Sequence, residues 1–126
     1  MNIILALHNI NRWLIIIVGL IAIIKFAAGW LRKQQFLPMD RGLMSGFTGL
    51  LDLQLLLGII LIINAGFSRT FVEHAFAMLI AVVVAHLSAL WRNVSDTVKF
   101  RNNFAAVAGA LIIIHLGLAV ILGWFS

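Results

Sequence analysis

The chain alternates between long apolar stretches and short polar segments. Four apolar stretches are found, at about 8–31, 43–63, 71–91 and 104–125. Each contains the roughly 17 to 25 residues that a helix needs to cross the hydrocarbon of a bilayer. Backbone polar groups cannot be left bare in lipid, and the alternation of a membrane β-barrel is missing. The pattern therefore predicts an all-α integral membrane protein with four transmembrane helices.

The polar segments between these stretches are short, at about ten residues each. Short connections favour antiparallel neighbours and leave no room for an extramembrane domain. We expect residues 1–126 to form a single domain, an up-down antiparallel bundle in the lipid bilayer.

Composition agrees with this class, because 63% of the residues are hydrophobic and only 10% are charged. Cysteine is absent, which excludes thiolate metal sites and c-type haem attachment. The net charge of +5 is scattered through the connections rather than gathered on one face, so no nucleic acid partner is expected. No basic segment precedes the first apolar run, so we expect it to be retained as a helix rather than cleaved as a signal peptide.

Local signals mark the expected helix boundaries. Pro38 is expected in the first connection, and Ala65-Gly66 ends the second apolar run. Thr70, with Glu73 three residues later, fits a capping box and predicts a helix start at Thr70. The four tryptophans are expected near the headgroups, where such rings anchor helices: Trp13, Trp30, Trp91 and Trp124.

The basic residues predict the orientation. The first and third connections carry six of them, whereas the opposite side carries only Arg12 and Arg69. Positive-inside reasoning places both termini outside the cytoplasm. Lys25 lies within the first span, where it either extends to the cytoplasmic boundary or pairs with Asp52. The six residues are Arg32, Lys33, Arg41, Arg92, Lys99 and Arg101.

All four histidines fall on or at the ends of the apolar stretches, where an ionisable side chain is costly and marks a candidate site. His8 and His74 lie toward the outer boundary, on helix faces rich in small residues, and are expected to point into the bundle. His115 lies near the midplane of the fourth span and is also expected to point inward, where a hydrogen bond to a neighbour would satisfy it. His86 is rotated by roughly 120° from His74 and lies off that small-residue face.

Two imidazoles that face each other across a helical bundle suit a six-coordinate b-type haem. His8 and His74 are the best pair for such a site, and Arg12 and Arg69 lie nearby to meet the propionates. Two alternatives remain open. In the first alternative, His8 and His74 bind copper or zinc together with Glu73. In the second, both histidines are polar side chains at the membrane interface without a ligand.

A second haem would have to use His86 and His115. Their expected depths differ by roughly 9 Å, so helix tilt would have to bring them level.

The motifs that carry these residues also suggest a family. A short four-helix membrane protein with histidines at the outer ends of helices one and three resembles small bacterial cytochrome b561-like proteins. The segments 8–13 and 52–58, with Glu73-His74 and Ala85-His86, also resemble a group of compact bacterial membrane proteins. The resemblance implies haem b and a location in the bacterial inner membrane. His74 and His86 do not share a face as the paired histidines of two-haem cytochromes b do, so we expect one haem rather than two.

Asp52 is a further candidate, because a carboxylate near the middle of a span is costly unless it is paired or protonated. It has a proton-linked or quinone-linked role, with Gln54, His115 or Lys25 as candidate partners, or it makes a structural hydrogen bond between helices.

Two functions fit the whole pattern. The first is a membrane electron carrier that passes electrons between a quinol pool or partner enzyme and an acceptor near the outer face. The second is a non-catalytic accessory subunit of a larger respiratory or photosynthetic complex. Other membrane protein subunits, or further copies of the chain, are the expected protein partners in both cases.

Overall fold

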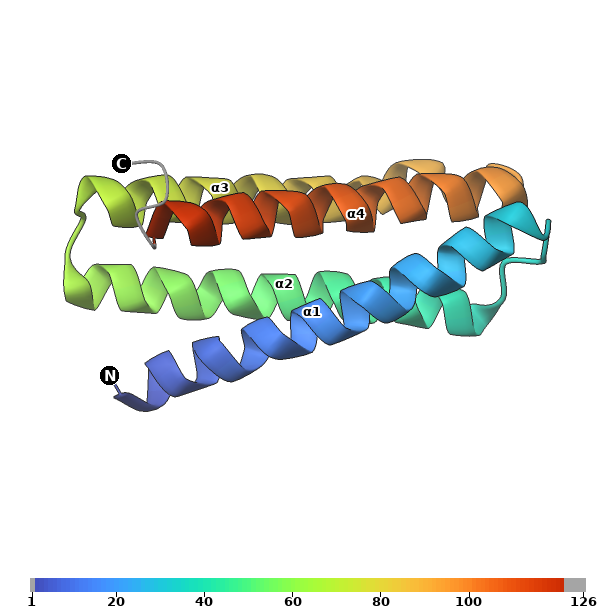
Figure 1. The fold of residues 1–126 in the computed structure, drawn as a ribbon. Helices are drawn as coiled ribbons and strands as arrows, with labels where there is room; N and C mark the ends of the chain where they lie inside the picture. Colours follow the sequence, from blue (N-terminus) through green and yellow to red (C-terminus); the bar gives the residue numbers. More distant parts are fainter. Residues whose placement is uncertain (1, 122–126) are drawn as a thin grey trace.

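The computed structural model describes residues 2–121 and shows four α helices in an up-down bundle (Figure 1). Helices next to each other in the chain pack side by side, and the first also packs against the fourth. All four helices are long and apolar enough to cross a membrane, which confirms the predicted fold class. The helices are α1 (Asn2–Leu31), α2 (Pro38–Ala65), α3 (Arg69–His86), followed by the 3-10 helix η1 (Leu87–Trp91), and α4 (Asp96–Ile121).

α1, α2 and α4 are longer and the connections shorter than the apolar stretches predicted, whereas α3 ends at His86 and the rest of its predicted span, to Trp91, is the 3-10 helix η1. Pro38 is the first residue of α2 rather than part of a loop, because a proline at that position gives up no helical hydrogen bond. α4 begins at Asp96, well before the predicted start of its span. The length of an apolar stretch reflects the thickness of the hydrocarbon, whereas these helices extend beyond the apolar stretches into polar sequence.

The predicted start of α3 at Thr70 is wrong. The helix begins at Arg69, and Ser68 is its N-cap, with the Ser68 hydroxyl accepting a hydrogen bond from the Phe71 backbone N–H at 3.2 Å. The predicted partner Glu73 instead pairs with Arg69 at 2.8 Å. The break predicted at Ala65-Gly66 is confirmed, and Gly66 has a φ of 101° that favours glycine.

The tryptophans do not all lie at helix ends. Trp30 and Trp91 do, as predicted, whereas Trp13 lies about three turns inside α1 because that helix starts at Asn2. Trp124 lies outside the described residues.

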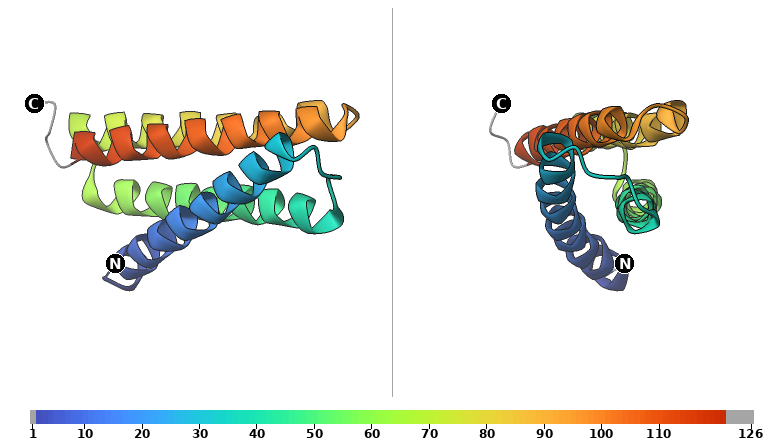
Figure 2. Two further views of the ribbon diagram at one scale, coloured as in Figure 1. Left: turned by 45° about the vertical axis from the view of Figure 1, so that its right-hand side comes forward. Right: turned by 90° about the vertical axis from the view of Figure 1, so that its right-hand side faces the viewer.

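The two ends of the bundle are packed differently. We call the end where α1 begins the N-terminal end, and the end where α1 finishes the opposite end. Figure 2 shows α1 crossing the other helices at an angle, so that its first half diverges from α4. The buried side chains of α1 all lie from Asn11 onward, and those of α3 from Ala81 onward. The tightly packed core therefore occupies the middle and the opposite end.

At the opposite end, Lys25 pairs with Asp40 at 2.8 Å, so the predicted alternative of a pair with Asp52 is wrong. The Asp40 side chain is completely buried and also accepts a hydrogen bond from the Leu37 backbone N–H at 2.9 Å. Lys25 lies 5.5 Å from the centre of the Phe100 ring. The aromatic residues gathered at this end are Phe26, Trp30, Phe36, Phe100 and Phe104.

Candidate functional site

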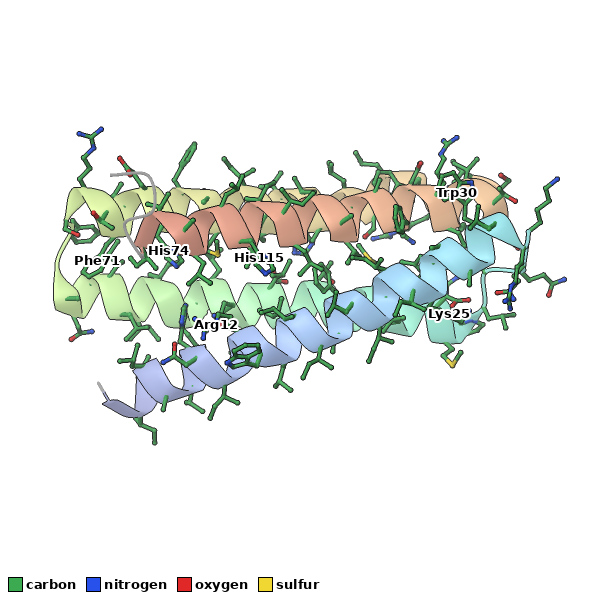
Figure 3. All side chains as sticks on the ribbon, viewed as in Figure 1. Arg12, Lys25, Trp30, Phe71, His74 and His115 are labelled. Atoms are coloured by element: carbon green, nitrogen blue, oxygen red, sulfur yellow. The ribbon has the colours of Figure 1, made fainter. Side chains whose placement is uncertain are left out.

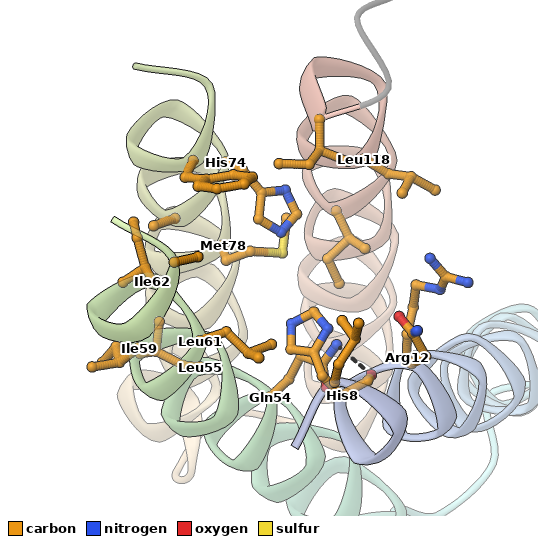
Figure 4. A pocket seen from close by; sticks show the side chains of 18 of the residues that line it. His8, Arg12, Gln54, Leu55, Ile59, Leu61, Ile62, His74, Met78 and Leu118 are labelled. Atoms are coloured by element: carbon orange, nitrogen blue, oxygen red, sulfur yellow. Dashed lines mark hydrogen bonds between the residues drawn. The ribbon is translucent and has the colours of Figure 1, made fainter. Parts of the chain in front are cut away.

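The N-terminal end encloses a cavity of about 530 Å³ that all four helices line. Its volume lies in the range of small-molecule and cofactor sites, which bury ligands among apolar side chains with a few polar groups. Figure 4 shows that His8 and His74 both point into it, from α1 and α3. The apolar lining includes Ile15, Leu51, Leu55, Ile59, Leu61, Ile62, Met78, Ile114 and Leu118.

His74 is held in one orientation by α4. Its Nδ1 lies 2.8 Å from the carbonyl oxygen of Gly117. A carbonyl only accepts hydrogen bonds, so Nδ1 carries a proton, and in the neutral ring Nε2 then keeps the free lone pair. Histidines that bind metals commonly have this arrangement, in which one ring nitrogen donates to a carbonyl and the other binds the metal.

Glycine at position 117 makes this hydrogen bond possible. A Cβ atom there would clash with the Met78 side chain and lie 3.1 Å from the Ala77 Cβ. Without a side chain, α4 approaches α3 closely enough for its carbonyl to reach His74. Met78 lies one turn below His74 on α3 and was not singled out from the sequence, although its i+4 spacing places it on the same face.

His8 is half-buried, and its position is fixed through α2. Gln54 donates from Nε2 to the His8 backbone carbonyl at 2.9 Å, and Asn11 donates to the Gln54 side-chain oxygen at 2.9 Å. Asn11 also donates to the Leu50 carbonyl at 3.0 Å. The His8 ring lies beside Gly58, where an added Cβ would be 3.6 Å from His8 Nε2. Buried polar contacts thus hold α1 against α2 within one turn of the imidazole.

Of the two arginines predicted beside the site, the structure brings only Arg12 to the cavity. Arg12 lines it, together with the polar side chains of Asn9 and Asn64. Arg69 is absent from the lining: its side chain is 92% exposed and it pairs with Glu73. Figure 3 shows Arg12 and His74 at the same end of the molecule, away from Lys25.

The copper or zinc alternative needs a third ligand. In the part of the chain from residue 2 to 121, no group of three histidine or acidic side chains is placed to hold a metal ion. Glu73, the expected third ligand, does not line the cavity. The residues present therefore do not fit a three-ligand protein site.

They do fit b-type haem, which needs only two protein ligands and an apolar surrounding. His8 and His74 supply two imidazoles on different helices, and the hydrogen bond of His74 Nδ1 to Gly117 leaves its Nε2 without a protein partner among residues 2–121. Arg12 supplies a cation for the acidic propionate groups, and the apolar lining suits the macrocycle.

The other two histidines are not brought together. His86 Nε2 lies 2.8 Å from Asp52 Oδ1 on the outside of the bundle, and His115 Nδ1 lies 2.7 Å from the carbonyl of Leu111 in its own helix. The contacts of His74 with Gly117 and of Gly109 with Val84 set the register of α3 and α4. In that register, His86 and His115 are about nine residues apart along the bundle axis, or about 13 Å. The structure does not assemble the second haem site.

Two further expectations from the sequence are wrong. His115 is exposed rather than inward, because its ring turns back to its own helix. Asp52 pairs with His86, and not with Gln54, His115 or Lys25. Helix faces can be estimated from spacing, but the register between two helices cannot, and that register decides which polar residues meet.

No protein-family model, curated protein or solved structure matches this chain. The resemblance to cytochrome b561-like proteins therefore stays a prediction from short motifs, and the geometry of the cavity is the stronger guide to function.

Proposed function

We propose that this protein is a membrane electron carrier that holds one b-type haem in the N-terminal cavity. The observation that carries the proposal is the convergence of His8 and His74, from α1 and α3, on one apolar cavity. Haem would supply reversible one-electron chemistry at this position.

The protein's own residues have distinct roles in this proposal. His8 and His74 would hold the haem, and the Gly117 carbonyl, which accepts from His74 Nδ1, would leave Nε2 as the nitrogen that binds it. Arg12 holds the acidic groups at the edge of the cavity. The Asn11–Gln54 contacts fix the backbone of His8, so that the ligand does not shift when the charge of the site changes.

The site lies toward the outer face of a bacterial inner membrane in this proposal. Six basic residues at or beyond the helix ends lie at the opposite end, where positive-inside reasoning places the cytoplasm. The electron acceptor is then on the outer side, and a quinol pool or partner enzyme in the membrane supplies the electrons.

The accessory-subunit alternative is favoured by one observation. Gly42, Gly46 and Gly49 lie exposed on α2, and an added Cβ at any of them would meet no atom within 4 Å. Glycines on a membrane helix allow close approach of another helix.

The proposal is tested by the visible spectrum of protein purified from cells that make haem. We expect a reduced-minus-oxidised spectrum of b-type haem and about one haem per chain in a direct haem assay. Changing His8 or His74 to alanine should abolish the bands, because each change removes one of the two side chains that would hold the haem.

His115→Ala is the matched control, since this histidine does not line the cavity. Its spectrum should be that of the unchanged protein. A protein without haem bands, or bands that survive the combined loss of His8 and His74, would contradict the proposal.

A further inference from the structure

The Asp52–His86 pair is a second polar site, separate from the cavity. It joins α2 to α3, and the Asp52 side chain is 49% exposed and that of His86 52%. Asp52 is near the middle of α2, about 20 Å from either end of the helix. On α3, His86 is the last residue of the helix, so the pair lies on the outer surface of the bundle between the middle and the opposite end.

A half-exposed polar pair within a membrane-spanning bundle is costly unless other polar groups complete its hydrogen bonds. Within residues 2–121, Asp52 Oδ2 and His86 Nδ1 make no side-chain hydrogen bond, since the pair is joined through Oδ1 and Nε2. One acceptor on the carboxylate and one ring nitrogen are left without a side-chain partner in this part of the chain. A ligand that satisfies them must be soluble in the bilayer and carry polar oxygens.

We propose that the Asp52–His86 pair binds the polar ring edge of a quinone or quinol from the membrane. This inference rests on the proposed electron-transfer function and gives the location of its lipid-soluble partner. A quinol hydroxyl donates a hydrogen bond to Asp52 Oδ2, and His86 Nδ1 donates to a quinone carbonyl when the ring is protonated. The pair can therefore bind both redox forms.

The position of the pair relative to the cavity supports this assignment. Leu51, the residue before Asp52, lines the cavity on the inner side of α2. Successive residues of an α helix are turned by about 100°, so a ligand at Asp52 lies on the flank of α2 next to the side that lines the cavity. The pair thus places a membrane-soluble partner beside the proposed haem site.

The surface beside the pair is shallow. Gly49 lies one turn from Asp52 on α2, and an added Cβ there would meet no atom within 4 Å. This position without a side chain leaves room beside the pair for a flat ring. A metal ion is a poorer occupant, because no third histidine or acidic ligand is placed near the pair among residues 2–121.

Photolabelling tests binding without haem. Protein in lipid nanodiscs would be irradiated with an azido-substituted benzoquinone that carries a decyl tail, and labelled peptides mapped by mass spectrometry. We expect label on the middle of α2 and the end of α3, displaced by excess unlabelled quinone. His86→Leu should reduce it about tenfold or more, since it removes the hydrogen bond to the quinone carbonyl, and Asp52→Leu should reduce it as well, since it removes the side chain that orients the His86 ring.

Two variants serve as controls. Glu73→Leu removes the carboxylate of an exposed pair elsewhere on α3 and should leave the label unchanged, whereas Asp52→Glu should restore most of it. Unchanged labelling in Asp52→Leu and His86→Leu would overturn the assignment. Conversion of a dimer to a monomer by Asp52→Leu, with quinone labelling that persists, would overturn it as well, because the pair would then be a contact between copies.

A second measurement separates this inference from the proposed function. In haem-loaded protein, Asp52→Asn should keep the dithionite-reduced spectrum but be reduced by a short-chain quinol about tenfold more slowly. Absence of haem from the unchanged protein would overturn the proposed function alone, since photolabelling still decides the quinone site. Equal quinol reduction in both proteins would overturn the quinone site alone.

Discussion

Each end of this bundle carries an ion pair, but one end is tightly packed and the other surrounds a cavity. At the opposite end, the Lys25–Asp40 pair and the Phe26 and Phe100 rings fill the space between helices, and Asp40 is fully buried. At the N-terminal end, the helices diverge around a cavity, and the Arg69–Glu73 pair is exposed. The packed end holds the helices together, so the hollow end can keep a space for a ligand.

The largest expected difference in stability is between variants of the two ion pairs, Lys25–Asp40 and Arg69–Glu73. Asp40→Ala should lower the free energy of unfolding in detergent by about 3–5 kcal/mol, because it leaves Lys25 without its partner beside a buried site. Glu73→Ala, in the exposed pair, should change it by less than about 1 kcal/mol. Equal losses in denaturant titrations of the two variants would show that the two ends contribute alike to stability.

A smaller difference in stability is expected when side-chain volume is added at two alanines of α3. Ala85 is fully buried, whereas Ala75 lines the cavity. Ala85→Leu should cost about 1–3 kcal/mol through overpacking. Ala75→Leu should leave thermal stability in detergent almost unchanged, because its new atoms enter empty space.

The same pair of variants connects packing to function. Ala75→Leu should lower the haem content of the purified protein, whereas the folded fraction of Ala85→Leu should load normally. A full haem content in Ala75→Leu would mean that the cavity is not the site of the haem.

The smallest contrast concerns the contacts that hold His8. Gln54→Leu should cost about 1–2 kcal/mol, because it leaves a buried Asn11 donor without its acceptor. Asn64→Leu, which removes only an exposed hydrogen bond to the Ile60 carbonyl, should cost less than about 0.5 kcal/mol. Chemical unfolding of both variants checks this order, and a larger loss in Asn64→Leu would reverse our view of how α1 is fixed.

The four helices could be predicted from the sequence because long apolar runs are typical of transmembrane helices. His8, His74 and Arg12 could also be identified as candidates, because polar residues within apolar spans carry an energetic cost and these lie on helix faces rich in small residues. The sequence could not give the partner of Asp52, which depends on the register of α2 against α3. It also gave His115 the wrong direction, because a helical histidine can bond to its own helix, here to the Leu111 carbonyl, instead of facing the bundle.

The hydrogen bond from His74 to Gly117 has a consequence for biogenesis. The ring that we assign as a ligand is oriented by α4, which is made after the other three helices. During synthesis, α1 and α3 can enter the membrane before anything fixes this imidazole. The complete site therefore forms only after α4 has left the ribosome and packed against α3, so the proposed haem would be loaded after this step.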